Sequence, residues 1–285
     1  MTKRSQPLLG AHMSIAGGPS KAIDRALSVG CTAMQIFVKN NMQWFAAPLP
    51  EKEVRDFLEH PRRKQLGSVF GHTGYMINLG AVNPDFHEKS LRALREELAR
   101  ADQLQLPFLV LHPGAHMGEG EEAGLKKIVA SLDAVFKALP DGHCKVALET
   151  TAGQGTTLGY RFEQLGWLLG HSAYPERLCI CLDTAHIFAA GYDITTEEGT
   201  RNTFEEFDRV IGLKHLAAIH LNDSRGGLGS RVDRHEHIGK GKIGLEAFRF
   251  IMHDPRLASI PKVLETPKGK ECKEDAENMA LLRSL

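Results

Sequence analysis

The stretch Cys181-Leu182-Asp183-Thr184-Ala185-His186 decides the fold, because an apolar run typical of a buried strand ends in a carboxylate and an imidazole. The same pattern recurs along the chain. Four further apolar runs each deliver a His or Glu at their C-terminal end: 109–112, 146–149, 217–220 and 263–265. Several strands are therefore expected to bring metal-ligand chemistry to one place.

Eight short apolar or β-rich segments alternate with helical patterns. The expected strands are 8–12, 33–38, 68–72, 108–112, 145–149, 178–183, 216–220 and 262–265. Strict alternation implies parallel strands with helical crossovers, and eight units over about 250 residues favour a (β/α)8 TIM barrel over an open doubly wound sheet. Ser20 is expected to cap the first helix. No linker or repeat divides the chain, so residues 1–285 are interpreted as a single domain.

Composition excludes several classes of protein. Lys and Arg together number 35, as do Asp and Glu, so the protein lacks the net positive charge that would indicate a nucleic-acid partner. The five cysteines are an odd number without CxxC spacing, which argues against both a disulfide framework and a thiolate zinc site. No apolar run has the length of a membrane span, and none near the N-terminus resembles a signal peptide. The expected location is the cytoplasm.

Nine candidate metal ligands lie where a TIM barrel places its active site. Six are at the expected strand ends, namely His72, His112, Glu149, Asp183, His220 and Glu265, and three follow in loops, namely His186, Asp233 and His235. Taken singly, a strand-end His is more often structural, and a carboxylate often caps a helix. Together they exceed the needs of one ion, since zinc takes about four ligands. Imidazole and carboxylate without thiolate suit Zn²⁺, Mn²⁺ or Fe in a hydrolytic site.

With these residues in place, the chain resembles the endonuclease IV family of apurinic/apyrimidinic (AP) endonucleases over essentially its whole length. Three blocks carry the resemblance: 149–155 (ETTAGQG), 183–193 (DTAHIFAAGYD), and 220–223 (HLND) leading to 229–235 (GSRVDRH). The opening 10–14 (GAHMS) and the segment 72–80 (HTGYMINLG) fit the same family. The resemblance therefore rests on stretches that hold all the candidate ligands except His112 and Glu265.

The resemblance implies a centre of three zinc ions and a DNA-repair activity. The implied ligand sets are His72, His112 and Glu149 for the first ion, Glu149 as bridge with Asp183, His220 and Glu265 for the second, and His186, Asp233 and His235 for the third. Glu149, Glu265 and Asp183 are the implied catalytic residues. The implied enzyme hydrolyses the phosphodiester 5′ of an abasic site, leaving a 3′-hydroxyl and a 5′-deoxyribose phosphate, and removes blocking groups from 3′ ends.

The implied partner is double-stranded DNA with abasic sites or blocked 3′ ends, bound by a monomer. Tyr75 and Met76 are the candidates for insertion beside a flipped-out abasic nucleotide. Met42 stands where the family frequently has an arginine that enters the base stack, which is a departure from the family pattern. Arg231 and Arg234 flank Asp233 and are candidate phosphate contacts.

Two other functions compete with this interpretation. A metal-dependent sugar isomerase or epimerase on the same barrel also collects Glu, Asp and His at its strand ends, but it needs about one or two metals. Asp233 and His235 would supply a third site that has no evident use in an isomerase. A non-catalytic binder of damaged DNA would not need a complete hydrolytic ligand set. Both alternatives are therefore less favoured than a metal-dependent nuclease.

Overall fold

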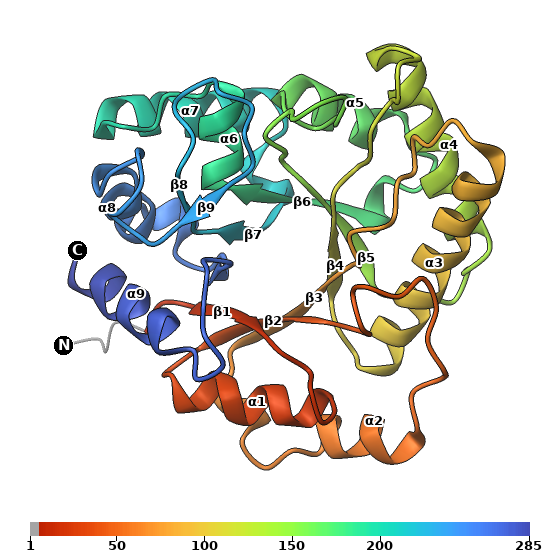
Figure 1. Cartoon of the computed structure of the whole chain (residues 1–285), viewed down its shortest axis with the longest axis horizontal. Coiled ribbons are helices and arrows are strands. Elements are labelled where there is room, and N and C mark those ends of the chain that lie inside the picture. The colour runs from red at the N-terminus through yellow and green to blue at the C-terminus, as the bar shows by residue number, and fades with distance from the viewer. Residues whose placement is uncertain (1–5) are drawn as a thin grey trace.

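The eight expected strand segments form a closed parallel barrel with helices around its outside (Figure 1). The structure is a computed structural model and describes residues 6–285. The barrel strands are β1 (Leu9–Met13), β2 (Ala33–Phe37), β3 (Ser68–His72), β4 (Phe108–Leu111), β5 (Lys145–Glu149), β6 (Leu178–Asp183), β7 (Leu216–His220) and β10 (Lys262–Leu264). They follow the order β1-β10-β7-β6-β5-β4-β3-β2, with β1 pairing β2 to close the ring. The TIM barrel expected from the sequence is confirmed.

The barrel is filled with side chains and is not a pore. Its interior holds small and aromatic residues from successive strands, and the rings of Phe70 and Phe108 stack with centroids 4.7 Å apart. Cys179 and Cys181 belong to this interior cluster, and all five cysteines are free and buried. Burial raises the pKa of the Cys181 thiol to about 12, so the sulfur stays protonated near neutral pH. Cys179 and Cys181 pack as small apolar residues beneath the strand ends.

Helices connect the strands and cover the outside of the barrel (Figure 1). They are α1 (Pro19–Ser28), α2 (Glu51–Leu58), α3 (Pro84–Gln103), α4 (Glu121–Lys137), α5 (Phe162–His171), α6 (Thr184–Ala190), α7 (Glu197–Val210), α8 (Glu246–His253) and α9 (Lys273–Ser284). Short 3₁₀ turns at Arg63–Gln65, Pro175–Arg177, Leu213–His215 and Pro255–Leu257 lead into β3, β6, β7 and β10. The expectation that Ser20 caps the first helix is wrong, because Pro19 already starts α1 and Gly18 occupies the cap position without a side-chain bond.

A two-stranded antiparallel sheet above the barrel was not expected from the sequence. It pairs β8 (Asp223–Ser224) with β9 (His235–Glu236) and folds the long loop after β7 back on itself. The Asp223 carboxylate accepts backbone N–H groups of Gly239, Gly241 and Ile243, each at 3.0 Å. The loop that carries Asp233 is therefore tied down at its base.

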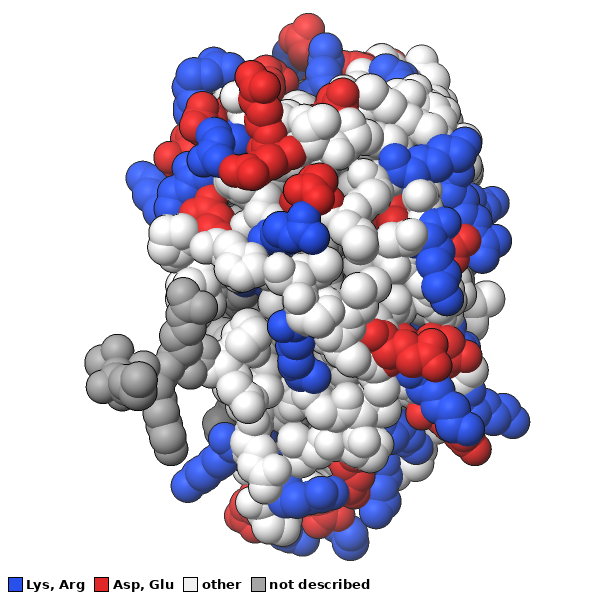
Figure 2. Space-filling model, turned by 90° about the vertical axis from the view of Figure 1, so that its left-hand side faces the viewer, with Lys and Arg blue, Asp and Glu red and all other residues white. Residues whose placement is uncertain are grey.

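Acidic and basic side chains are interspersed on the side of the molecule that carries α8 and α9, and no large area of one sign stands out there (Figure 2). This agrees with the equal numbers of acidic and basic residues in the sequence. Among residues 6–285, no helix has the length and apolar character needed to cross a membrane.

Candidate metal centre

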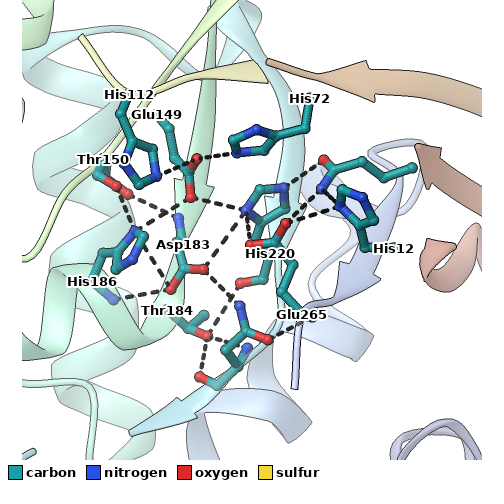
Figure 3. A network of polar contacts seen from close by, with 12 residues as sticks. His12, His72, His112, Glu149, Thr150, Asp183, Thr184, His186, His220 and Glu265 are labelled. Carbon is teal, nitrogen blue, oxygen red and sulfur yellow. Dashed lines mark hydrogen bonds and ion pairs between the residues drawn. The ribbon is translucent and has the colours of Figure 1, made fainter. Parts of the chain in front are cut away.

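The candidate ligands at the strand ends and in α6 converge at the C-terminal end of the barrel (Figure 3). Four of them are the last residues of strands, namely His72 in β3, Glu149 in β5, Asp183 in β6 and His220 in β7. His112 and Glu265 come directly after β4 and β10. Parallel strands place their final residues on one rim, so positions distant in sequence become neighbours.

The first group of donors is His72, His112 and Glu149. Both imidazoles point an Nε2 atom at the same carboxylate oxygen, with Oε2 of Glu149 lying 3.2 Å from His72 and 3.0 Å from His112. The opposite ring nitrogen of His72 lies 2.7 Å from the carbonyl oxygen of Thr73. A proton on that nitrogen can be donated to the carbonyl, which leaves Nε2 free to act as a ligand.

The second group consists of Glu149, Asp183, His220 and Glu265. The Glu149 oxygen on this side is Oε1. Nδ1 of His220 lies 2.9 Å from Glu149 Oε1, 3.3 Å from Glu265 Oε2 and 3.7 Å from Asp183 Oδ2. Glu149 therefore faces the first group with one oxygen and the second group with the other. A carboxylate in this position is suited to bridge two cations.

The third group lies around His186 and His235, where α6 begins and the β8–β9 loop returns. Asp183 also belongs to this group, because a carboxylate oxygen of Asp183 and one ring nitrogen each of His186 and His235 all lie within 4.8 Å of one another. Oδ1 of Asp233 lies 3.2 Å from Nε2 of His186 and 3.6 Å from Nε2 of His235. The family resemblance implies Asp183 as a ligand of the second ion alone, whereas in the structure its carboxylate lies in both the second and the third group.

The local backbone explains why Asp183 can take this position. It ends β6 and is also the N-cap of α6, where its Oδ1 accepts the backbone N–H of His186 at 2.9 Å. Its Oδ2 accepts an N–H of the Asn222 side chain at 2.7 Å. The carbonyl oxygen of the same Asn222 side chain accepts the backbone N–H of Glu265 at 2.8 Å. Asn222 was quoted in the sequence only as part of a motif, and its role in aligning two carboxylates was missed.

The buried carboxylates and imidazoles of the cluster stabilise each other's charged forms. Burial alone would raise the pKa of Glu149, yet the neighbouring His112 and His220 hold it well below its usual value. Burial would likewise lower the pKa of His186, but Asp183 and Asp233 raise it well above its usual value. Each of the three groups offers ligand atoms that all lie within 4.8 Å of one another. Nitrogen and carboxylate donors this close match the donor chemistry of divalent metal ions.

One side of the cluster is open to solvent. The side chains of His112 and Asp233 are 33% and 40% exposed, while Glu149, Asp183 and His220 are fully buried. A hollow of about 220 Å³ lies beside these two exposed residues, and Arg234 is part of its wall. A substrate would reach the cluster from this side.

Comparison with known proteins identifies the family. The family model described as "Xylose isomerase-like TIM barrel" matches residues 23–285. A probable endonuclease 4 of Chloroflexus aurantiacus is 52% identical over 98% of both chains, and one of Geobacter sulfurreducens is 50% identical over 97% of this chain and 94% of that one. The chain belongs to the endonuclease IV family. As a member of this family it is a nuclease, that is, a phosphodiester hydrolase.

Solved structures support the same family, and some sugar epimerases share the fold. The crystal structure of endonuclease IV from Thermus thermophilus aligns with a TM-score of 0.86, 36% identity and 98% coverage of both chains. A D-tagatose 3-epimerase-like protein aligns with a TM-score of 0.71 at 17% identity, covering 96% of both chains. At that identity the epimerase shares the fold alone. The likeness to the epimerase therefore gives no evidence on the activity of this chain.

Exposed apolar side chains gather around the mouth of this endonuclease IV barrel. Within residues 6–285, the exposed large hydrophobic residues are Met42, Tyr75, Val82, Phe86, Met117, Leu228 and Val232. All of them lie in loops after barrel strands, except Phe86 in the first turn of α3. Met42 and Tyr75 are the most prominent of the residues expected to contact DNA, at 75% and 59% exposed.

The other residues expected to contact DNA differ in their surroundings. Met76 is half-buried and lines a small interior space with Trp44 and Glu97. Arg231 is exposed and holds its guanidinium 4.6 Å above the ring centre of Tyr160. Arg234 donates to the backbone carbonyl of Asp233 at 2.6 Å. Arg234 therefore lies beside the open side of the cluster and Arg231 stacks on Tyr160, whereas Met76 packs between two loops.

Proposed function

We propose that this endonuclease IV family member is a zinc-dependent AP endonuclease of base excision repair. It would hydrolyse the phosphodiester 5′ of an abasic site and give a 3′-hydroxyl and a 5′-deoxyribose phosphate. The same centre would act as a phosphodiesterase and phosphatase on blocked 3′ ends. The observation that carries this proposal is the continuous donor cluster, in which Glu149 joins the first and second groups and Asp183 joins the second and third.

The residues of the cluster fit three divalent ions. The first group would hold one ion, the second group another, and His186, His235 and Asp233 a third with Asp183 alongside. We propose Zn²⁺ because the donors are nitrogen and carboxylate oxygen, and the same set also suits Mn²⁺ or Fe at one or more sites. When bound, such ions lower the pKa of water and offset the negative charge of a phosphodiester.

The side chains of the cluster would divide the remaining work. Glu149 and Asp183, both fully buried and each facing two donor groups, would set the spacing within the centre. The Glu265 carboxylate is partly accessible, so it could accept a proton released by the attacking water. His112 and Asp233 lie on the open side, where the scissile phosphate would enter. No serine, cysteine or lysine nucleophile is required.

Damage recognition would use the apolar loops at the mouth. Met42 and Tyr75 would enter the minor groove beside the abasic nucleotide, and Met76 would support their loops from behind. Arg231 and Arg234 would contact backbone phosphates next to the cluster. The partner would be double-stranded DNA, bound by a cytoplasmic monomer in which residues 1–285 form one domain. Local contacts of this kind do not require a basic charge over the whole protein.

The proposal is tested with a duplex that carries one tetrahydrofuran abasic analogue, beside an intact duplex, without added magnesium. The analogue cannot undergo β-elimination, so a cut on its 5′ side that leaves an extendable 3′-hydroxyl requires hydrolysis. Glu149→Gln should reduce the rate at least about 100-fold. The matched control Glu122→Gln changes an exposed glutamate on α4 and should have no effect.

An unchanged intact duplex is part of the expected result. Absence of cleavage by protein shown to carry zinc would overturn the proposal, and turnover of a ketohexose by the same preparation would then favour the epimerase alternative.

A further inference from the structure

The histidines of the cluster differ in which ring nitrogen faces the carboxylates. In three of them Nδ1 meets a backbone carbonyl and Nε2 faces the cluster: His72 to Thr73 at 2.7 Å, His186 to Thr150 at 2.8 Å, and His235 to Glu265 at 3.3 Å. Nδ1 of His186 also lies 3.3 Å from Oε1 of Glu149, but its contact with the Thr150 carbonyl is shorter. His220 is turned the other way. Its Nδ1 faces Glu149 and Glu265, and its Nε2 faces a side chain instead of the backbone (Figure 3).

The side chain behind His220 is Gln35, whose Oε1 lies 2.8 Å from His220 Nε2. Gln35 is fully buried in the middle of β2, between Met34 and Ile36. A buried amide in an apolar strand is costly unless its polar atoms are hydrogen-bonded. Its bonds therefore account for its presence in the strand, and they all lead to the rim of the barrel.

The orientation of the Gln35 amide follows from its other partner. Its Nε2 lies 2.6 Å from Oε1 of Glu265, and an ionised carboxylate can only accept. The atom facing Glu265 must therefore be the NH₂ group, which also lies 2.8 Å from Nδ1 of His12. It follows that the Gln35 atom facing His220 is the carbonyl oxygen, and that this oxygen accepts the N–H of His220 Nε2. Neutral His220 then carries its lone pair on Nδ1.

We propose that Gln35 is a positioning residue that makes His220 a metal ligand through Nδ1 and holds Glu265 in the same ligand group. The inference rests on the proposed metal centre and adds the residue that aligns two of its ligands. One amide donates to the carboxylate ligand and accepts from the imidazole ligand. The Gln35 side chain thus fixes the position of Glu265 and the tautomer of His220 together, as hydrogen-bond partners of metal ligands do.

The first test is NMR of the zinc-loaded protein with ¹⁵N-labelled histidine. Long-range correlations from the ring protons to both nitrogens show which nitrogen carries the proton and which binds metal. The expected spectrum contains one zinc-bound histidine with a protonated Nε2 and a metal-bound Nδ1, while the others bind through Nε2. A spectrum in which every zinc-bound histidine is coordinated through Nε2 would overturn the inference without any mutation.

The second test compares Gln35→Met with Gln164→Met. The control also removes a buried amide, since Gln164 on α5 bonds Gly159 and Glu121 and touches no proposed ligand. Gln35→Met should release one zinc ion to a chelator about 10- to 100-fold faster and lose the Nδ1-bound histidine signal. Gln164→Met should keep both properties. Zinc retention by Gln35→Met within about twofold of the unchanged protein would refute the inference.

The two proposals fail in different ways. Zinc-loaded protein that shows the Nδ1-bound histidine but leaves the abasic duplex intact would sink the endonuclease and keep the role of Gln35. Cleavage of the abasic duplex by protein whose zinc-bound histidines all use Nε2 would support the endonuclease and overturn the role of Gln35. Protein that binds no divalent metal would overturn both.

Discussion

Replacing Lys39 by methionine should destabilise the protein at neutral pH and much less in mild acid. Lys39 and Glu97 form a buried ion pair with Nζ and Oε1 3.0 Å apart, and both side chains are at most 2% exposed. The other oxygen of Glu97 accepts the backbone N–H of Gly74 at 2.9 Å. The pair thus connects α3 to the loop after β2, which carries Met42, and to the loop after β3.

The magnitude follows from the geometry of the pair. At 3.0 Å the attraction is about 5.5 kcal/mol for an effective dielectric constant near 20. Burial nevertheless raises the pKa of Glu97 despite the opposing effect of Lys39. Removing one partner of a buried pair costs about 3–5 kcal/mol, because the other charge is left uncompensated. Lys39→Met should therefore lose about 3–5 kcal/mol at pH 7.5.

The pH dependence has a definite sign. Without Lys39 the pKa of folded Glu97 rises further above its unfolded value of about 4.3, so the folded state binds more protons in that window. The destabilisation is then small below the unfolded pKa and grows as pH rises through the folded pKa. Adding Glu97→Gln should restore about 2 kcal/mol or more at pH 7.5, because the amide is neutral and still accepts from Gly74.

Urea unfolding at pH 5 and pH 7.5 measures these differences, each variant being compared with the unchanged protein at the same pH. Lys52→Met is the control, since Lys52 pairs with Asp56 on the exposed face of α2 and should contribute less than about 1 kcal/mol. Equal destabilisation of Lys39→Met at both pH values, or no recovery of stability on adding Glu97→Gln, would contradict this role of the ion pair.

Three further predictions concern the metals, the DNA loops and the barrel. Chelation should lower the melting temperature in calorimetry and added zinc should restore it, because cations offset the buried charges of Glu149 and Asp183; an unchanged melting temperature would contradict this. Tyr75→Ala should weaken binding to the abasic duplex in gel-shift assays about tenfold. It should change the urea stability by less than about 1 kcal/mol, since Tyr75 is 59% exposed; equal loss of binding to intact duplex would argue against lesion recognition. Gly10→Ala should cost at least about 3 kcal/mol in urea unfolding, because its Cβ would lie 1.7 Å from the Ala33 carbonyl oxygen, whereas Gly227→Ala has open space and should be neutral.

Some strands could be predicted to the residue, and the reason is physical. The segments 145–149 and 178–183 are apolar runs covered on both faces, by the barrel interior and by helices, and each ends at a single polar residue. Strand-end placement alone could bring six of the candidate ligands to one place, because all parallel strands of a barrel end at one rim. Their division into three groups came from the family resemblance.

Other features depend on contacts that have no local pattern. The β8–β9 pair has two residues per strand and joins residues on either side of a long loop, which leaves no periodicity to detect. Gln35 reads as an irregularity in an apolar strand until its distances to His220 and Glu265 are measured. Met76 follows Tyr75 and looks equally exposed in sequence, yet the loop turns it inward.

Asp183 performs its tasks with a side chain of one particular length. One carboxylate oxygen caps the N-terminus of α6, and the other accepts a hydrogen bond from the Asn222 side chain. The same carboxylate belongs to two donor groups. A glutamate would reach one methylene further and lose the cap, and an asparagine would lose the charge. Substitution of Asp183 would therefore disturb the helix start and the alignment of the ligands together. An engineer who transplants the centre to another barrel would have to move the strand end and the helix start as one piece.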